Sequence, residues 1–195
     1  MKTVPVKISE VELIESFGKF LINQDLIDYE NSHFSGDDNH NADVALSLKP
    51  GKWPGIQVDK LHIEVKSHHS EDSQNTINKI FGQLLKETGK RSLDKEKECL
   101  AILFPYERGA WPGRNNKTVT RIEGEAYYRR GFSRIDKQTF VKFGDLVGAK
   151  YILSFSTASN TLNVFEWKNF LDEEFSPMIS LTNGSSRSLR SLGTG

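Results

Sequence analysis

Residues 61–69 of this chain, LHIEVKSHH, have the alternating pattern of a β-strand. Successive side chains of a β-strand point to opposite faces, so Ile63 and Val65 are expected to share one face. Glu64 and Lys66 then lie together on the other face. The apolar face predicts packing against a core, whereas the adjacent carboxylate and ammonium on the opposite face require a separate explanation.

A hairpin and a helix are predicted around this strand. The loop KPGKWPG turns the chain back between strands 42–48 and 58–67. Ser9 and Glu12 have the spacing of a capping box, and apolar residues recur behind them, so a helix is expected over 9–24. The later elements are a helix from Ser73 to Gly89, a strand over 99–104, helices over 117–132 and 137–148, and a hairpin of strands 151–156 and 162–167.

The order of these elements predicts an α/β fold of three layers, with helices flanking a central mixed sheet. The polar stretch 31–41 has the composition of a turn. Residues 1–176 are expected to form a single domain, because this length suffices for one substantial core. The Ser/Gly-rich residues 177–195 are expected to form a disordered tail.

The composition is that of a soluble globular domain, with 36% hydrophobic and 27% charged residues in 195. No apolar window reaches the length of a membrane span, and the N-terminus lacks an apolar signal core. We therefore expect no membrane partner and a cytoplasmic location. The single cysteine, Cys99, lies in an apolar run, which excludes an internal disulfide and predicts a buried thiol.

The charges are unevenly distributed although the net charge is zero. Residues 1–48 hold three Lys/Arg against nine Asp/Glu, whereas residues 108–142 hold nine against three. A basic segment in a neutral chain is typical of a nucleic-acid-binding surface or of a solvated helix face, and charge alone does not decide between them. The candidates for phosphate contacts are Arg114, Lys117, Arg121, Arg129, Arg130 and Arg134.

Asp43 begins the strand that is expected to pair with strand 58–67. Its carboxylate should therefore lie at the same end of the sheet as Glu64 and Lys66. Two carboxylates supply the oxygen ligands that a hard divalent cation prefers. An ammonium two residues along the strand can contact the water that such a metal activates. The sequence thus predicts a site for metal-dependent hydrolysis.

The spacing of these residues resembles the PD-(D/E)XK nuclease superfamily, whose sheet carries a D…E-x-K signature. Asp43 and the triplet E-V-K at 64–66 match it, and Ala42 stands where the signature has proline. A preceding helix of that fold often donates another carboxylate, and Glu10 has the matching phase. The first helix is also similar to that of archaeal Holliday-junction resolvases, and the resemblance extends over residues 9–104.

This resemblance implies a restriction-endonuclease-like fold and an endonuclease that uses Mg²⁺, with Mn²⁺ able to substitute, and acts on DNA. The implied catalytic residues are Asp43, Glu64, Lys66, Glu10 and Gln83, and the implied metal ligands are Asp43, Glu64 and the Val65 carbonyl. One metal site cuts one strand, so a double-strand break would be served by a two-fold dimer. A homodimer is therefore expected.

Each of these residues also has a purely structural interpretation. Asp43 can cap the entry to its strand, and Gln83 can be an ordinary polar residue of a helix. Glu64 and Lys66 can form an exposed surface pair that contributes little to stability. Two tryptophans, Trp53 and Trp111, can anchor their loops on the core or stack against unstacked bases.

Three glutamates compete for the catalytic place on the first helix. Glu10 can serve only the helix N-terminus, where a negative charge is favourable. Glu12 and Glu15 are its rivals for the active site. Two alternatives also remain for the whole chain: a nuclease fold that binds nucleic acid without cleaving it, and an unrelated α/β interaction protein.

Overall fold

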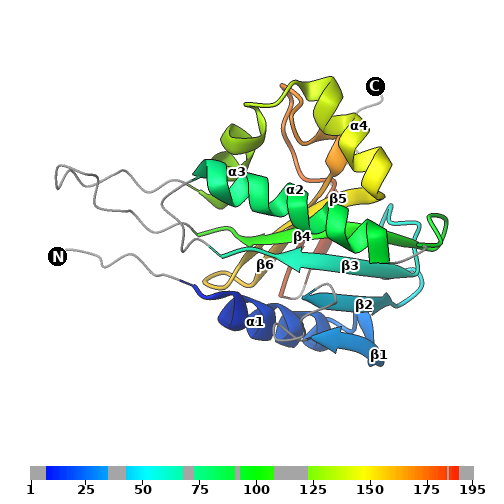
Figure 1. Cartoon of the computed structure of the whole chain (residues 1–195). Helices are drawn as coiled ribbons and strands as arrows, with labels where there is room; N and C mark the ends of the chain where they lie inside the picture. The colour runs from blue at the N-terminus through cyan, green and yellow to red at the C-terminus, as the bar shows by residue number, and fades with distance from the viewer. Residues whose placement is uncertain are drawn as a thin grey trace, which may run out of the picture.

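The computed structural model describes residues 8–34, 43–67, 73–90, 93–107, 123–183 and 185–188. Eight strands form one sheet whose spatial order follows the chain from β1 to β8. Figure 1 shows the sheet between two helical layers, with α1 on one side and α2, α3 and α4 on the other. The expected α/β class with a mixed sheet is confirmed.

The helices are α1 (Glu10–Asn23), α2 (Ser73–Lys90), α3 (Gly124–Phe132) and α4 (Lys137–Val147), with a 3-10 helix η1 (Trp167–Asn169). The strands are β1 (Ile27–Phe34), β2 (Val44–Leu48), β3 (Lys60–Val65), β4 (Glu98–Pro105), β5 (Ala149–Ser156), β6 (Thr161–Glu166), β7 (Ile179–Thr182) and β8 (Ser185–Ser188). The predicted capping box between Ser9 and Glu12 starts α1. Gly148, with φ of 76°, ends α4 in the left-handed conformation that glycine adopts readily.

The centre of the sheet is parallel and its two flanks are antiparallel. β1, β2 and β3 pair antiparallel, β3 to β5 pair parallel, and β5 to β8 pair antiparallel again. The predicted hairpins β2–β3 and β5–β6 are confirmed. The second of them turns through Asn160, which has a positive φ of 49°. The parallel pairs require crossovers, which α2 and then α3 with α4 supply.

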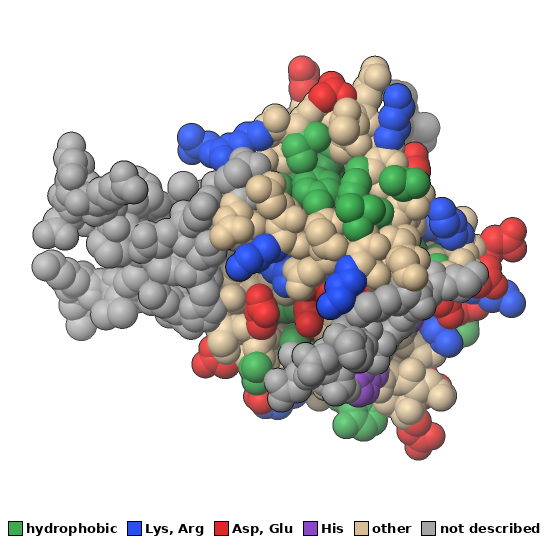
Figure 2. Space-filling view, in the orientation of Figure 1, with side chains coloured by type: hydrophobic (Ala, Val, Ile, Leu, Met, Phe, Trp, Pro, Cys, Tyr) green, Lys and Arg blue, Asp and Glu red, His purple; other side chains and the backbone are tan. Residues whose placement is uncertain are grey.

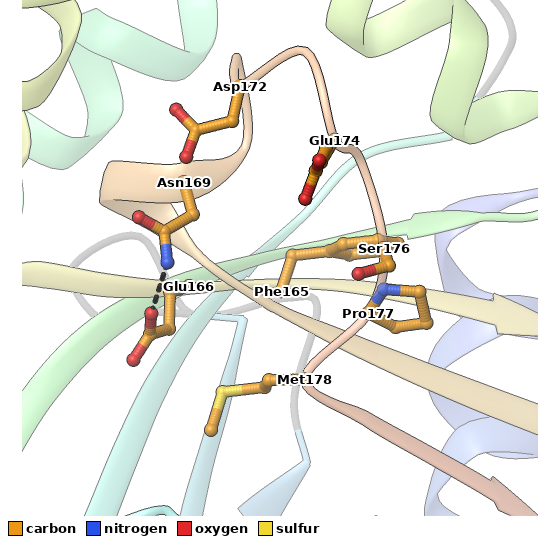
Figure 3. A pocket seen from close by; sticks show the side chains of 8 residues that line it. All are labelled: Phe165, Glu166, Asn169, Asp172, Glu174, Ser176, Pro177 and Met178. Carbon is orange, nitrogen blue, oxygen red and sulfur yellow. Dashed lines mark hydrogen bonds between the residues drawn. The ribbon is translucent and has the colours of Figure 1, made fainter. Parts of the chain in front are cut away.

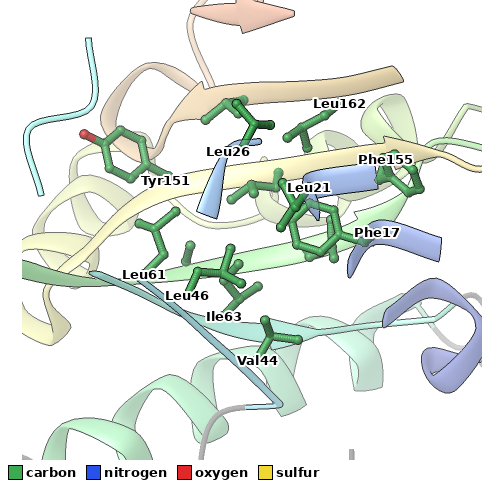
Figure 4. Packing of buried hydrophobic residues seen from close by; sticks show 14 of the residues in the cluster. Phe17, Leu21, Leu26, Val44, Leu46, Leu61, Ile63, Tyr151, Phe155 and Leu162 are labelled. Carbon is green, nitrogen blue, oxygen red and sulfur yellow. The ribbon is translucent and has the colours of Figure 1, made fainter. Parts of the chain in front are cut away.

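Each face of the sheet carries its own hydrophobic core. The core under α1 joins helix residues such as Phe17 and Leu21 to Ile63, Phe155 and Leu162 of the strands (Figure 4). The core on the opposite face packs α2, α3, α4 and η1 against alternate residues of β4 to β6. Because β3 has helices over both faces, its polar side chains are enclosed as well as its apolar ones.

Two sequence-based boundaries are wrong. Residues 27–34 form β1, although most of its side chains are polar, because an edge strand needs only a few apolar contacts to pair. Residues 177–195 are not a disordered tail throughout, since β7 and β8 extend the sheet. β7 belongs to the fold because Ile179 and Leu181 are buried in the α1 core. Residues 35–41, 184 and 189–195 of these two predictions lie outside the described residues.

Three smaller expectations can be compared with the structure. Cys99 is a buried free thiol, as predicted. Trp53 is buried, and its ring N–H donates to the Leu26 carbonyl over 2.8 Å, so it anchors its loop. Trp111 and the start of the predicted helix 117–132 lie outside the described residues. None of the helices within the described ranges is long and apolar enough to cross a membrane.

Candidate active site at the end of strand β3

Asp43 and the E-x-K triplet meet through the β2–β3 hairpin. The antiparallel register pairs Val44 with Ile63, which places Asp43, the residue before β2, beside the end of β3. The Asp43 Oδ2 accepts a hydrogen bond from the backbone N–H of Val65 over 2.8 Å. The predicted convergence of Asp43 with Glu64 and Lys66 is therefore present in the structure.

Glu64 and Lys66 form a buried ion pair. The Lys66 Nζ lies 2.6 Å from the Glu64 Oε1, and the two residues are 5% and 9% exposed. This contradicts the interpretation of an exposed surface pair. The physical reason is that β3 lies inside the sheet and α2 covers the face to which both side chains point.

The cluster carries more negative charge than Lys66 neutralises. Burial, together with the nearby carboxylates of Asp43 and Glu10, raises the pKa of Glu64 to about 7, although the Lys66 ammonium opposes the shift. Burial also raises the pKa of Asp43 above its ordinary value. The arrangement therefore favours any positive charge that enters beside these two carboxylates.

Of the three competing glutamates, Glu10 reaches the site. Its Oε1 accepts a hydrogen bond from the backbone N–H of Ser67, directly after Lys66, over 3.2 Å. Glu12 instead closes the capping box, where its Oε2 accepts from the Ser9 backbone N–H over 2.8 Å. Glu15 lines a groove on the outer side of α1. The rotation of the helix thus decides which of the three belongs to the site.

A cavity of about 570 Å³ opens beside the ion pair. Its lining residues are Glu10, Lys66, Ser67, Thr76, Lys79, Gly82, Gln83 and Lys86. The Gln83 Oε1 is buried there and has no hydrogen-bond partner among the described residues. Figure 2 shows Lys or Arg side chains directly beside carboxylates on this face of the molecule. The cavity therefore joins an anionic end to a cationic wall on α2.

The cationic wall is the part of the site that sequence reasoning missed. Lys79, Gln83 and Lys86 are spaced by four and three residues, which places them on one side of α2. That spacing was visible in the sequence. Only the position of α2 over the end of β3 shows that this side borders the carboxylates.

The carboxylates fit a hard divalent cation in their chemistry, because every donor is an oxygen. Asp43 and Glu64, together with the carbonyl of Val65, would supply these oxygens. Burial, together with the neighbouring carboxylates of Asp43 and Glu10, raises the pKa of Glu64, and a bound cation would oppose this shift. No three acidic, His or Cys side chains of the described residues are arranged as a complete metal cage.

The basic segment of residues 108–142 is only partly described. Arg114, Lys117 and Arg121 lie outside the described residues. Arg129 is held by the protein, because its guanidinium donates to the Phe170 carbonyl over 3.2 Å and lies 4.8 Å from the Phe175 ring centre. Its position is therefore explained by packing of α3 against the segment after η1. Arg130 and Arg134 are exposed.

A second polar hollow lies on the connection from β6 to β7 and has a volume of about 180 Å³ (Figure 3). Two of its three carboxylates, Glu166 and Asp172, already have partners. Asn169 donates to Glu166 over 2.5 Å, and Lys137 pairs with Asp172 over 2.7 Å. This hollow lacks the buried charge imbalance found at the end of β3, so we retain the β3 cluster as the candidate active site.

Comparisons with known proteins do not add to this geometry, since no protein-family model, curated protein or solved structure matches the chain.

Proposed function

We propose that the chain is a metal-dependent endonuclease of the PD-(D/E)XK type, with a restriction-endonuclease-like fold, that hydrolyses phosphodiester bonds in DNA. The support for this proposal comes from the residues at the end of β3. A strand-borne E-x-K triplet, a strand-borne aspartate and a glutamate from the preceding helix lie together, beside a cavity walled by lysines. A hydrolase for a polyanion needs both a place for a cation and a place for phosphate.

The buried Glu64–Lys66 pair is the observation that carries the proposal. Replacing a buried ion pair by well-packed apolar residues is often neutral or stabilising, by about 1–4 kcal/mol. Stability therefore does not explain why this pair occupies the interior strand of the sheet. A chemical use does explain it, because such a position keeps the two groups desolvated and fixed.

The residues of the chain have distinct roles in this proposal. A divalent cation held by Asp43 and Glu64 would supply Lewis acidity toward the phosphate and a more acidic water. Lys66 would orient the attacking water and stabilise negative charge that develops on the phosphate. Lys79 and Lys86 would hold the phosphate backbone in the cavity. Glu10 would position a water molecule at the end of β3.

The decisive experiment is cleavage of DNA by the purified chain. Supercoiled, linear, branched and single-stranded DNA, with RNA for comparison, are incubated with Mg²⁺ or Mn²⁺, and EDTA serves as the metal-free control. We expect metal-dependent products that the Asp43→Asn variant does not form, because the amide lacks the charge that a hard cation needs. Cleavage by this variant at the wild-type rate would show that the proposed site is wrong.

A chain that binds these nucleic acids but cleaves none of them with either cation would be a non-catalytic binding protein instead. Binding without metal separates the two cases. Asp43→Asn should bind DNA at least as tightly as the wild type in EDTA, because the substitution removes one negative charge from the site.

A further inference from the structure

An apolar patch lies on the outer side of α1 and β1, in a groove that shares no lining residue with the cavity of the candidate active site. We call it the α1–β1 patch and define it by Val11, Ile14, Ile22, Tyr29 and Phe34. Three of the five exposed large hydrophobic side chains among the described residues belong to it, with exposed fractions of 60% for Val11, 45% for Ile22 and 62% for Tyr29. Such a concentration on one surface is typical of an interface.

The patch is a shaped groove with a volume of about 540 Å³. The Phe34 ring forms its floor, because it lies against Gly18 at the middle of the helix, where a Cβ atom would come within 3.1 Å of the ring. The Tyr29 ring stacks on Phe34 at a centroid distance of 6.5 Å. The groove therefore has an aromatic wall on β1 and an aliphatic wall on α1.

The charges within the groove indicate what fills it. Val11, Glu15, Gly18 and Ile22 follow one another at intervals of four, three and four residues, so they form one stripe along α1. Lys19 lies beside this stripe and also lines the groove. Glu15 and Lys19 form no ion pair among the described residues. The acidic Glu15 thus lies before the midpoint of α1, and the basic Lys19 lies after it.

This arrangement of charged and apolar residues on α1 is complementary to a second copy of itself that is related by a two-fold axis. A second α1 that crosses the first in the antiparallel direction, with the axis near residue 17, places each Glu15 opposite the Lys19 of the other copy. The same operation brings the Val11 end of each helix to the Ile22 end of its partner. A parallel alignment in register would instead place Glu15 against Glu15.

We propose that the α1–β1 patch is a homodimer interface in which two copies of this chain pack α1 against α1 in the antiparallel direction. The dimer buries the exposed aliphatic and aromatic side chains and forms the Glu15–Lys19 pair twice. This dimer proposal does not depend on the proposed function, because the mass of the protein in solution can be measured without a cleavage assay.

The test is the mass of the full chain by sedimentation or light scattering over a range of concentrations. We expect the wild type to approach twice the mass of one chain as concentration rises. The Val11→Glu/Ile22→Glu variant should raise the dissociation constant by about 100-fold, because four carboxylates per dimer then replace apolar side chains that the interface buries. Leu146→Glu, a change at an exposed leucine on α4, is the matched control and should leave the mass unchanged.

A charge exchange tests the arrangement of the two helices. Glu15→Lys alone and Lys19→Glu alone should each weaken the dimer by about tenfold, because like charges then face each other. The double variant Glu15→Lys/Lys19→Glu should recover dimerisation. Circular dichroism confirms that every variant is folded. A monomeric wild type at all concentrations, a dimer broken by Leu146→Glu, or a double variant that does not recover would each overturn the proposal.

Discussion

Glu64 and Glu125 are two carboxylates buried on the same face of the sheet, and burial raises the pKa of both. The hydrogen-bond donors to Glu125 are neutral, although the Glu123 carboxylate lies nearby. The Glu125 Oε1 accepts from the Ser154 hydroxyl and from the Asn163 amide, the latter over 2.8 Å. Asn163 in turn accepts from the Ser180 hydroxyl over 2.8 Å. Glu64 instead has an ammonium, two further carboxylates and an adjacent cavity.

Burial of a carboxylate therefore does not by itself mark a functional site. Hydroxyl and amide groups supply the hydrogen bonds of the buried Glu125 carboxylate. We therefore interpret this network as a structural feature that links α3 to β5 and β6. The Glu64 cluster instead combines one ammonium with three carboxylates beside a cavity. The following experiments test whether this distinction is functional.

The largest effect is expected from the same substitution at the two positions. Glu64→Gln should lower the DNA cleavage rate by about 10³-fold, because the amide is a poor ligand for a divalent cation and cannot pair with Lys66. Glu125→Gln should leave the rate within about threefold of the wild type, since an amide oxygen can still accept from Ser154 and Asn163. Initial cleavage rates at saturating Mg²⁺ measure both. If both variants lost the same fraction of the cleavage rate, Glu64 and Glu125 would not differ in function.

The next experiment separates the stability of the ion pair from its use. Lys66→Met should lower the free energy of unfolding by about 3–5 kcal/mol, because Glu64 then lacks its counter-ion in the interior. The Glu64→Leu/Lys66→Met variant should be at least as stable as the wild type but inactive. Urea unfolding and cleavage assays measure the two properties. If the double variant were as unstable as Lys66→Met, the Glu64–Lys66 pair would be needed for the stability of the fold.

A smaller effect is expected for the cationic wall. Lys79→Ala/Lys86→Ala should weaken DNA binding by about tenfold and reduce the magnitude of the salt slope by about 1.8, because each neutralised phosphate contributes about 0.9 to the slope. Arg130→Ala/Arg134→Ala is the matched pair from the basic segment. Binding curves at several salt concentrations compare the two variants. If only the arginine variant binds more weakly, the phosphate-binding surface lies on α3 and not in the cavity.

The smallest effect concerns the stability contributed by Glu125. Its pKa is raised in the folded state, so the folded protein holds this proton more tightly than the unfolded chain. Stability from this group is therefore fully present below the unfolded pKa and is lost as pH rises through the folded pKa. Glu125→Gln should remove this loss and raise the melting temperature at pH 8 by about 2–4 °C, which corresponds to about 1 kcal/mol. The same melting temperature as the wild type at pH 5 and at pH 8 would contradict this account.

Local periodicity was sufficient to predict the elements that carry the site. Alternation along 60–65 and the turn before it predicted the hairpin that brings Asp43 to Glu64. Gln83 was named from the resemblance to the PD-(D/E)XK superfamily, and the structure places it in the cavity lining beside Lys66. Such patterns involve residues that are close together in the chain, so they can be recognised from the sequence alone.

Tertiary contacts decided what the sequence left open. β1 was missed because edge strands carry few apolar residues, and β7 because its two buried positions stand in a polar segment. The choice of Glu10 over Glu12 and Glu15 depends on how α1 is rotated against the sheet. The engagement of Arg129 depends on the segment that follows η1, more than 40 residues away in the chain.

The order of the strands has a consequence for synthesis of the protein. Every strand is hydrogen-bonded to the strand that precedes it in the chain, so no strand must insert between two that are already paired. As the polypeptide leaves the ribosome, the sheet can grow at one margin only, by successive addition. Glu10, Asp43, Glu64, Lys66 and Gln83 all lie in the first 83 of 195 residues. The chemical groups of the site thus all precede β4 and the later strands in the order of synthesis.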